Sequence, residues 1–187
     1  NGNANTRPIK GSLARGFDIE SDKTAIINLQ NSKKDCAENL MIVDLSRNDL
    51  SRNCTAGSIN VDELFAIETY ATVHHMASSI NGRKQKNSST LDLIKGCFPP
   101  GSMTGTPKIK AMEICSQMEN LKRGIYAGGI GWFGGDGSAD LSVVIRTIIL
   151  QGNKFEFQVG GAIVNDSEAH LEFEETMLKS KGIANTL

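Results

Sequence analysis

The segment HLEFEETMLKSK, residues 170–181, spaces acidic and basic side chains in a way that could bind a metal ion. Glu172 and Glu175 are three residues apart and Lys179 follows four later, so a helix would put all three on one face. Two carboxylates on one face suit Mg²⁺, a hard cation that often takes only one or two protein carboxylates plus a substrate oxyanion. The same spacing also predicts a plain surface ion pair between Glu175 and Lys179, and the segment alone leaves both readings open.

Arg146 interrupts the apolar run VVIRTIIL, which predicts a buried strand around a guanidinium group. A buried guanidinium requires a carboxylate partner, because an unpaired charge is very costly away from water. Arginine is well suited to bidentate capture of a carboxylate. The partner could be a side chain of the protein or the carboxylate of a ligand.

The segment GSMTGTPK, residues 101–108, offers backbone N–H groups, two threonine hydroxyls and a lysine ahead of an expected helix. Such a helix N-terminus can bind an anion, although a plain glycine-rich turn would have the same composition. The segment is not a nucleotide-binding P-loop, because Pro107 and Lys108 do not follow its pattern.

Two further places carry groups that could do chemistry. In VHHMASS, His74 and His75 are adjacent, which predicts one structural ring and one functional ring; metal binding would need a third ligand nearby. In RPIKGSLARG, Lys10 lies between Pro8 and Gly11, so an extended and then flexible backbone could present its amine to a ligand. Most lysines, however, simply face water.

Helices and strands must position these groups. Apolar and charged spacing favours a helix over residues 37–50, with a strand as the lesser alternative. It also predicts a short helix capped by Thr90, one from Pro107 to Gly124, and a C-terminal one capped by Ser167 or Asp166. Residues 61–81 fit a helical turn or a strand, and residues 128–164 predict an antiparallel meander of three strands. Together these elements predict an α+β fold with antiparallel β-sheets flanked by helices.

Composition narrows the class of protein. The chain has 187 residues, 39% of them hydrophobic, which is enough for one globular domain with a core. A net charge of −1 without blocks of like charge argues against a nucleic-acid-binding protein. The longest apolar runs are too short to span a membrane. Four widely spaced cysteines predict reduced thiols in the cytoplasm. The opening NGNANTRP has neither an initiator Met nor a signal peptide pattern, so we expect an excerpt of a longer protein.

Seven blocks span nearly the whole chain: RPIKGSLARG, AENLMIVDLSRNDLSRNC, VHHMASS, FPPGSMTGTPKIKAME, GGIGWF, LSVVIRT and VGGAIVNDSEAHLEFEET. In this order and with these intervals they resemble the C-terminal part of the chorismate-utilising enzymes. The resemblance implies the chorismate-binding fold of that family, of which residues 1–187 would be the C-terminal part. It also implies an enzyme that acts on chorismate.

The resemblance assigns roles to the residues that match the family's motifs, in three groups. Mg²⁺ would be held by carboxylates: Glu38 and Glu175, with Glu172 and Asp35 in or near the metal shell. Chorismate would contact six positions, with the pyruvyl group at Tyr126, Arg146, Gly160 and Gly161 and the ring at Gly11 and Thr104. The catalytic residues would be Lys10, His75 and Lys179.

Lys10 distinguishes the branches of the family, because a lysine in PIKG marks the branch that makes 4-amino-4-deoxychorismate for p-aminobenzoate and folate. The resemblance then implies amination of chorismate by ammonia from a glutaminase partner, with the Lys10 amine as nucleophile. The alternatives are anthranilate synthase component I, or a truncated chorismate-binding module without activity of its own.

The chain departs from the family's pattern in three ways. Ser12 replaces a common threonine, and Ala139-Asp140-Leu141 stands where relatives often have Met-Asp-Thr. Relatives also carry a longer upstream part.

Overall fold

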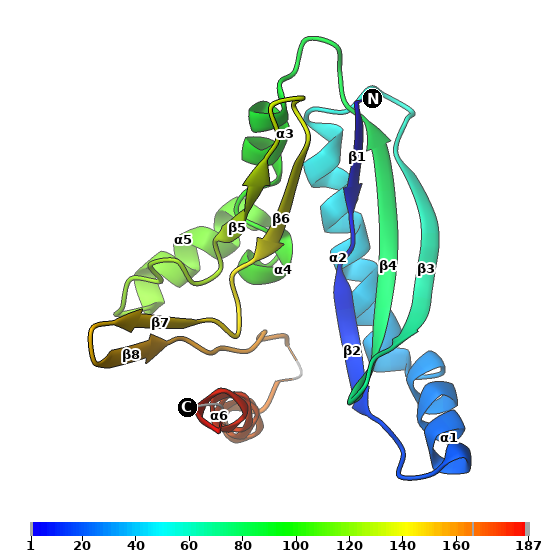
Figure 1. Cartoon of the computed structure of the whole chain (residues 1–187), viewed down its shortest axis with the longest axis vertical. Coiled ribbons are helices and arrows are strands. Elements are labelled where there is room, and N and C mark those ends of the chain that lie inside the picture. The colour runs from blue at the N-terminus through cyan, green and yellow to red at the C-terminus, as the bar shows by residue number, and fades with distance from the viewer. Residues whose placement is uncertain (1, 166, 186–187) are drawn as a thin grey trace. The chain divides into compact units, whose positions relative to one another are not determined.

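The computed structural model describes residues 2–165 and 167–185 and divides into two compact units, residues 1–102 and 103–187. Strands and helices occur in both units (Figure 1), so the predicted α+β class is confirmed. In the described part of the chain, no helix has the length and apolar character needed to cross a membrane.

The first unit is built on the long central strand β4, Val73–Arg83. One edge of β4 pairs with two successive short strands, β1 (Asn3–Thr6) and β2 (Ile9–Ala14), and the other edge pairs with β3 (Asn60–Thr69). All of these pairings are antiparallel. The ambiguous stretch 61–81 is therefore a β-hairpin, and the helical alternative for its first residues is wrong.

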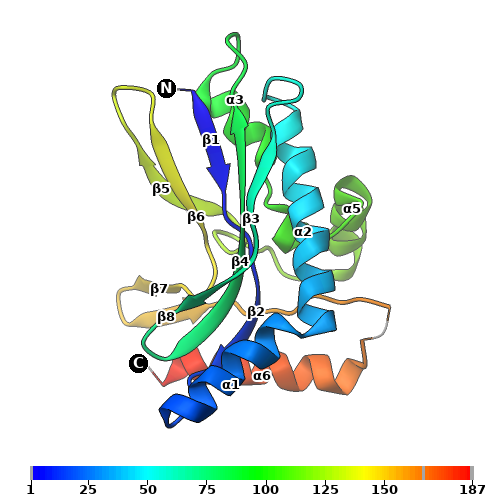
Figure 2. The same ribbon diagram turned by 90° about the vertical axis from the view of Figure 1, so that its right-hand side faces the viewer.

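Two helices follow β2: α1, Ile19–Gln30, and α2, Lys33–Ser51. The Ser32 side chain caps α2 by accepting a hydrogen bond from the backbone N–H of Asp35. The helix α2 runs alongside β2 and β4 (Figure 2). The helix predicted over 37–50 is thus confirmed, with one more turn at its start.

The core of this unit lies between α2 and the sheet. Five buried residues form it: Ala4, Val43, Leu50, Cys54 and Ile80. Burying such apolar side chains is the main favourable contribution to folding. A short helix, α3 (Thr90–Cys97), packs Leu93 and Cys97 against this cluster. Its N-cap is Ser89, so the prediction of Thr90 as the cap is wrong by one residue.

A partly buried charge network joins α1 to the sheet. The Arg15 guanidinium donates two hydrogen bonds to the Asp22 carboxylate, at 2.7 and 2.8 Å, and holds the pKa of that carboxyl well below its usual value. The Nε2 atom of His74 and the backbone N–H of Gly16 each lie 2.9 Å from Asp22 Oδ1. The His74 side chain is fully buried, so this ring has a structural role.

We expect the Asp22 carboxylate to make stability depend on acid pH. Because its pKa in the folded state lies below the value of about 3.9 in an unfolded chain, the stabilisation is complete above about pH 4 and is lost as the pH falls. Asp22→Asn should therefore lower the melting temperature at neutral pH and flatten its decline in acid. Thermal unfolding across pH 2–7 (about the range over which carboxylates titrate) measures both effects.

Asp44→Asn is the matched control, because Asp44 pairs with Arg47 at 2.8 Å while 63% of its side chain is exposed. Exposed pairs of this kind contribute little to stability. If Asp44→Asn and Asp22→Asn gave the same acid profile, the assignment of this pH dependence to Asp22 would be wrong.

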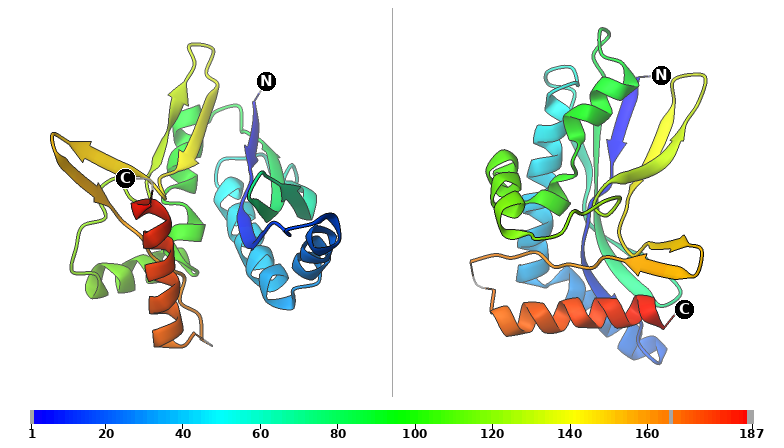
Figure 3. Two further views of the ribbon diagram at one scale, coloured as in Figure 1. Left: turned by 60° about the horizontal axis from the view of Figure 1, so that its bottom comes forward. Right: turned by 90° about the vertical axis from the view of Figure 1, so that its left-hand side faces the viewer.

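The second unit contains one helix, two β-hairpins and the C-terminal helix within its described residues. The helix α5 spans Lys108–Met118. The first hairpin consists of β5 (Gly129–Phe133) and β6 (Ala139–Val143). The second hairpin consists of β7 (Ile148–Gln151) and β8 (Lys154–Phe157). The helix α6 spans Ala169–Ala184 and follows the second hairpin (Figure 3). A four-residue helix, α4 (Gly101–Thr104), lies at the boundary between the units.

The predicted meander is wrong, because the run VVIRTIIL does not form one strand. Its chain leaves β6 at Val143, passes Arg146 with a φ of 49°, and starts β7 at Ile148. A non-glycine residue in this left-handed region breaks the ladder. The two hairpins consequently belong to separate two-stranded sheets.

Two predicted helix ends also differ. The helix α5 ends at Met118 with Glu119 as C-cap, well before Gly124. The helix α6 has Glu168 at its N-cap position. Ser167 instead accepts a hydrogen bond from Val164 N and donates one to Glu172, and Asp166 lies outside the described residues.

Candidate functional site

Lys10 lies on a β-bulge that turns it toward α2. Ile9 pairs with Ala77 and Ser12 with His75, so β2 contains one more residue than β4 between these pairs. A bulge of this kind redirects a side chain locally. The Nζ atom of Lys10 lies 3.7 Å from Oε2 of Glu38, and only 23% of the lysine side chain is exposed. The structure thus brings together two residues that are distant in sequence and were predicted to share a site.

Gly11 and Asp35 form the second contact between the bulge and α2. Gly11 has a φ of 92°, which favours glycine, and a Cβ atom there would lie 3.0 Å from Asp35 Cβ. The Asp35 carboxylate accepts a hydrogen bond from the hydroxyl of Ser32. Four predicted site residues of the first unit therefore gather where β2 meets α2: Lys10, Gly11, Asp35 and Glu38.

His75 has surroundings different from those of buried His74. Its Nδ1 atom and the Ser12 hydroxyl share a hydrogen bond of 2.6 Å, and its ring lies 5.5 Å from the Tyr70 ring between centroids. The Tyr70 hydroxyl donates to Glu68 at 2.6 Å, which raises the pKa of the tyrosine. The sequence predicted one structural and one functional histidine, and burial identifies His74 as the structural one.

In the second unit, the loop after β8 lies along one face of α6. The Lys179 ammonium donates a hydrogen bond to the carbonyl of Gly160 at 3.3 Å and lies 2.7 Å from a carboxylate oxygen of Glu175. A Cβ atom on Gly161 would lie 3.3 Å from Glu172 Oε2. Both glycines, both glutamates and the lysine were predicted site residues, and they lie together here.

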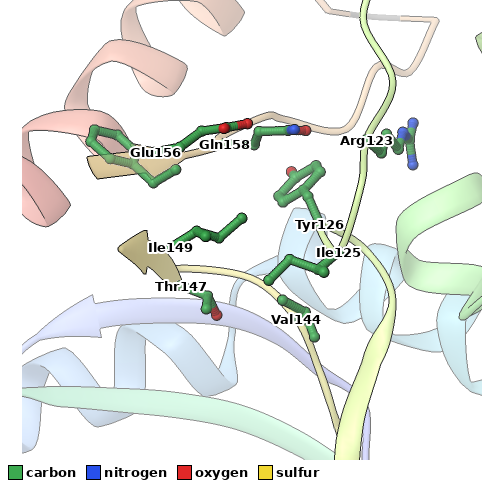
Figure 4. Close-up of a pocket in the computed structure, with 9 residues that line it drawn as sticks. Arg123, Ile125, Tyr126, Val144, Thr147, Ile149, Glu156 and Gln158 are labelled. Carbon is green, nitrogen blue, oxygen red and sulfur yellow. The ribbon is translucent and has the colours of Figure 1, made fainter. Parts of the chain in front are cut away.

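Tyr126 adjoins the same loop. A Cβ atom on Gly160 would lie 3.0 Å from the Tyr126 hydroxyl oxygen. Tyr126 also lines a small cavity between the chain before β5 and the β7–β8 hairpin (Figure 4), where its ring lies beside Gln158 and Arg123 extends away. The cavity has a volume of about 10 Å³, the size of a single water molecule, so it is no substrate pocket by itself.

Arg146 and Thr104 are the remaining predicted site residues. Arg146 is exposed, so the prediction of a buried guanidinium is wrong, and the need for a partner no longer follows from burial. The cause is the break at its left-handed φ, which takes the residue out of the apolar strand. Thr104 is the last residue of α4, and its hydroxyl donates to the Gly105 carbonyl at 3.4 Å.

The predicted metal carboxylates occur as two similar pairs. Asp35 and Glu38 on α2, and Glu172 and Glu175 on α6, are each three residues apart on one helix. In each pair a serine hydroxyl donates to the first carboxylate and a lysine amine lies near the second. Among the described residues, no three His, Cys, Asp or Glu side chains form a metal-binding group. A pair of hard oxygen donors nevertheless suits Mg²⁺, which often takes only one or two protein carboxylates.

Sequence reasoning missed the residues that hold the candidate residues in place. Asn39 and Ser78 are fully buried and share a hydrogen bond of 2.6 Å beside the Lys10 bulge. Ser167 holds Glu172 at 2.6 Å. Asn39 directly follows Glu38 in AENL, and an amide at a core position of a helix is the signal that could have identified it.

The chain is similar to known chorismate enzymes along its whole length. It is 46% identical over 187 residues to "Aminodeoxychorismate synthase, chloroplastic" of Arabidopsis thaliana. The matched region covers 100% of this chain but only 20% of that protein. It is 42% identical over 187 residues to "Aminodeoxychorismate synthase component 1" of Escherichia coli, of which it covers 41%. The chain thus spans less than half the length of these relatives.

A solved structure and a family model agree with these similarities. The structure of anthranilate synthase component I from Streptococcus pneumoniae matches with a TM-score of 0.87 and 37% identity, covering 98% of this chain and 40% of that one. The model described as chorismate binding enzyme matches residues 1–185. The α+β architecture is therefore the chorismate-binding fold, and the chain belongs to the chorismate binding enzyme family.

Proposed function

We propose that the protein carrying this chain aminates chorismate to 4-amino-4-deoxychorismate, a step toward p-aminobenzoate and folate. The observation that carries the proposal is the Lys10 amine, partly buried on its bulge 3.7 Å from Glu38. The relatives named aminodeoxychorismate synthase, at 46% and 42% identity, support the same branch. Ammonia would come from a glutaminase partner, consistent with the name "component 1" of the Escherichia coli relative.

Lys10 would act as a nucleophile. Its neutral amine adds to the ring of chorismate as the allylic hydroxyl leaves, and the ring double bonds shift. The proton that the nitrogen loses is taken up by the departing hydroxyl, which leaves as water. Ammonia then bonds to the carbon that bore the hydroxyl, the bond to Nζ breaks, and the double bonds shift back. The amine must be neutral to attack, and the bulge places it 3.7 Å from Glu38.

Mg²⁺ would neutralise the carboxylate of the substrate ring and offset negative charge that develops on the ring. The residues assigned to hold it are Glu38 and Glu175, with Asp35 and Glu172 beside them. Ser32 and Ser167 keep one carboxylate of each pair oriented by donating hydrogen bonds.

The remaining assigned residues bind and orient the substrate. Arg146 would pair with the pyruvyl carboxylate, a role that its exposed guanidinium leaves open. The Tyr126 hydroxyl and the backbone of Gly160 and Gly161 would hold the same group, with Lys179 fixing the Gly160 carbonyl. His75, whose Nδ1 is held by Ser12, would present Nε2 to the substrate, and Gly11 and Thr104 would contact the ring.

The compartment is proposed from the thiols. Cys36, Cys54, Cys97 and Cys115 are all free, which supports a reducing compartment such as the cytoplasm.

The test is mass spectrometry of the products that the full-length protein forms from chorismate, Mg²⁺ and ammonium. An amino product that keeps the pyruvyl group is the expected result. Anthranilate, which lacks this group, would instead move the protein to the branch of its Streptococcus pneumoniae structural neighbour. Chorismate binding without any product would identify a binding module and overturn the enzymatic proposal.

A further inference from the structure

The bulge that carries Lys10 leaves two backbone carbonyls facing a side chain of α2. An extra residue interrupts the regular ladder between β2 and β4, so local backbone groups need other partners. The side-chain amide nitrogen of Asn39 donates to the carbonyl of Lys10 at 3.4 Å and to the carbonyl of Met76 at 3.3 Å. An amide NH₂ group has two N–H donors, so it can serve both strands at once.

The other end of the Asn39 amide is held equally firmly. Its Oδ1 atom accepts a hydrogen bond of 2.6 Å from the Ser78 hydroxyl, which itself accepts one of 3.1 Å from Phe65 N. Asn39 and Ser78 are both 0% exposed. A buried network in which these atoms all have partners fixes one arrangement of the strands around it.

The helix α2 therefore contacts Lys10 at two points. Asn39 holds the backbone carbonyl of Lys10, and the preceding residue, Glu38, lies near its amine. We propose that Asn39 is a positioning residue that fixes the bulge and so directs the Lys10 amine to Glu38. The functional part of this inference depends on the role proposed for Lys10 in amination.

The bulge matters because it separates Lys10 from Ser12. In a regular strand, residues two apart point to the same face. Here Ser12 contacts His75, whereas Lys10 contacts Glu38 on α2. An apolar side chain of the same shape could fill the space of Asn39, but it could not donate to both carbonyls.

The test replaces Asn39 in the full-length protein. Asn39→Leu keeps the approximate shape and removes both donors, and Asn39→Ser is a smaller second variant in case the first does not fold. We expect kcat for amination to fall by about a hundredfold, with KM for chorismate changing far less, because the reacting amine is misplaced. Val43→Ala is the control for a merely structural loss, since Val43 is a buried core residue of α2.

A second readout follows Lys10 without turnover. Lysines labelled by reductive methylation with ¹³C-formaldehyde give separate NMR signals, and the Lys10 signal is assigned by its absence in Lys10→Arg. At one fixed pH, this signal should move in Asn39→Leu and stay in place in Val43→Ala. Hydrogen exchange of residues 9–14 should become faster in the Asn39 variants alone.

The two readouts separate the inference from the proposed function. If Lys10→Ala aminated chorismate normally, the proposed function would fail, and the placement of Lys10 by Asn39 would be judged on the NMR signal alone. An unchanged Lys10 signal in Asn39→Leu would overturn the inference. So would a kcat loss in Val43→Ala that equals the loss in Asn39→Leu at the same decrease in melting temperature.

Discussion

Lys10→Ala is expected to reduce the rate of chorismate amination by at least about a thousandfold, because it removes the proposed nucleophile. The fold should survive, since the backbone carbonyl of residue 10 can still accept from Asn39 and the side chain was partly exposed. Binding of chorismate should change little. Steady-state rates of formation of the amino product, with KM and melting temperature measured beside them, test these expectations.

Lys34 supplies the matched control. Its Nζ lies 4.0 Å from the other carboxylate oxygen of Glu38, but 80% of its side chain is exposed. Lys34→Ala removes a positive charge near the same carboxylate and should leave the rate within about twofold, as expected of an exposed pair. Equal losses in the two variants would mean that charge near Glu38 matters and that Lys10 is no nucleophile.

Glu175→Gln is expected to raise the Mg²⁺ concentration for half-maximal activity by at least about a hundredfold, because it removes a proposed ligand without changing size. The variant also removes the ion pair with Lys179, whose amine lies 2.7 Å from Glu175. The fold should persist, because 54% of the Glu175 side chain is exposed. The measurement is the amination rate across a Mg²⁺ series at saturating chorismate.

Glu174→Gln is the control on the same helix. Glu174 is exposed and lies one residue away, so its side chain points about 100° from that of Glu175 around the helix. Its Mg²⁺ dependence should match the unmodified protein. A Glu175→Gln enzyme with unchanged Mg²⁺ dependence would remove this residue from the metal site and leave it as the surface partner of Lys179.

The elements that the sequence predicted well have regular patterns. The helix over 37–50 and the C-terminal helix both show apolar and charged residues at helical spacing, and both occur. The sequence did not clearly predict strand β3, because its register with β4 shifts twice, between Val61 and Glu63 and between Glu63 and Ala66. Each shift interrupts the alternation of period two on which strand prediction depends.

Sequence motifs indicated the residue types of the candidate site, but they did not indicate how these residues are arranged in space. Residue types in AENL and FEET indicated carboxylates, and PIKG indicated a lysine. Lys10 faces Glu38 because of a bulge between β2 and β4. These strands are far apart in sequence, so no local sequence pattern predicts how they pair. Arg146 was misjudged for a related reason, because its apolar neighbours suggest a continuous strand.

The backbone at Arg146 has a consequence for engineering this protein. An L-residue with φ near 49° costs of order 1–2 kcal/mol that a glycine would not incur. A selection for heat resistance alone would therefore favour glycine at position 146, and would discard the guanidinium assigned to the pyruvyl carboxylate. Variants evolved toward thermostability should keep this position fixed, because the substitution that relaxes the chain removes the group proposed to recognise the substrate.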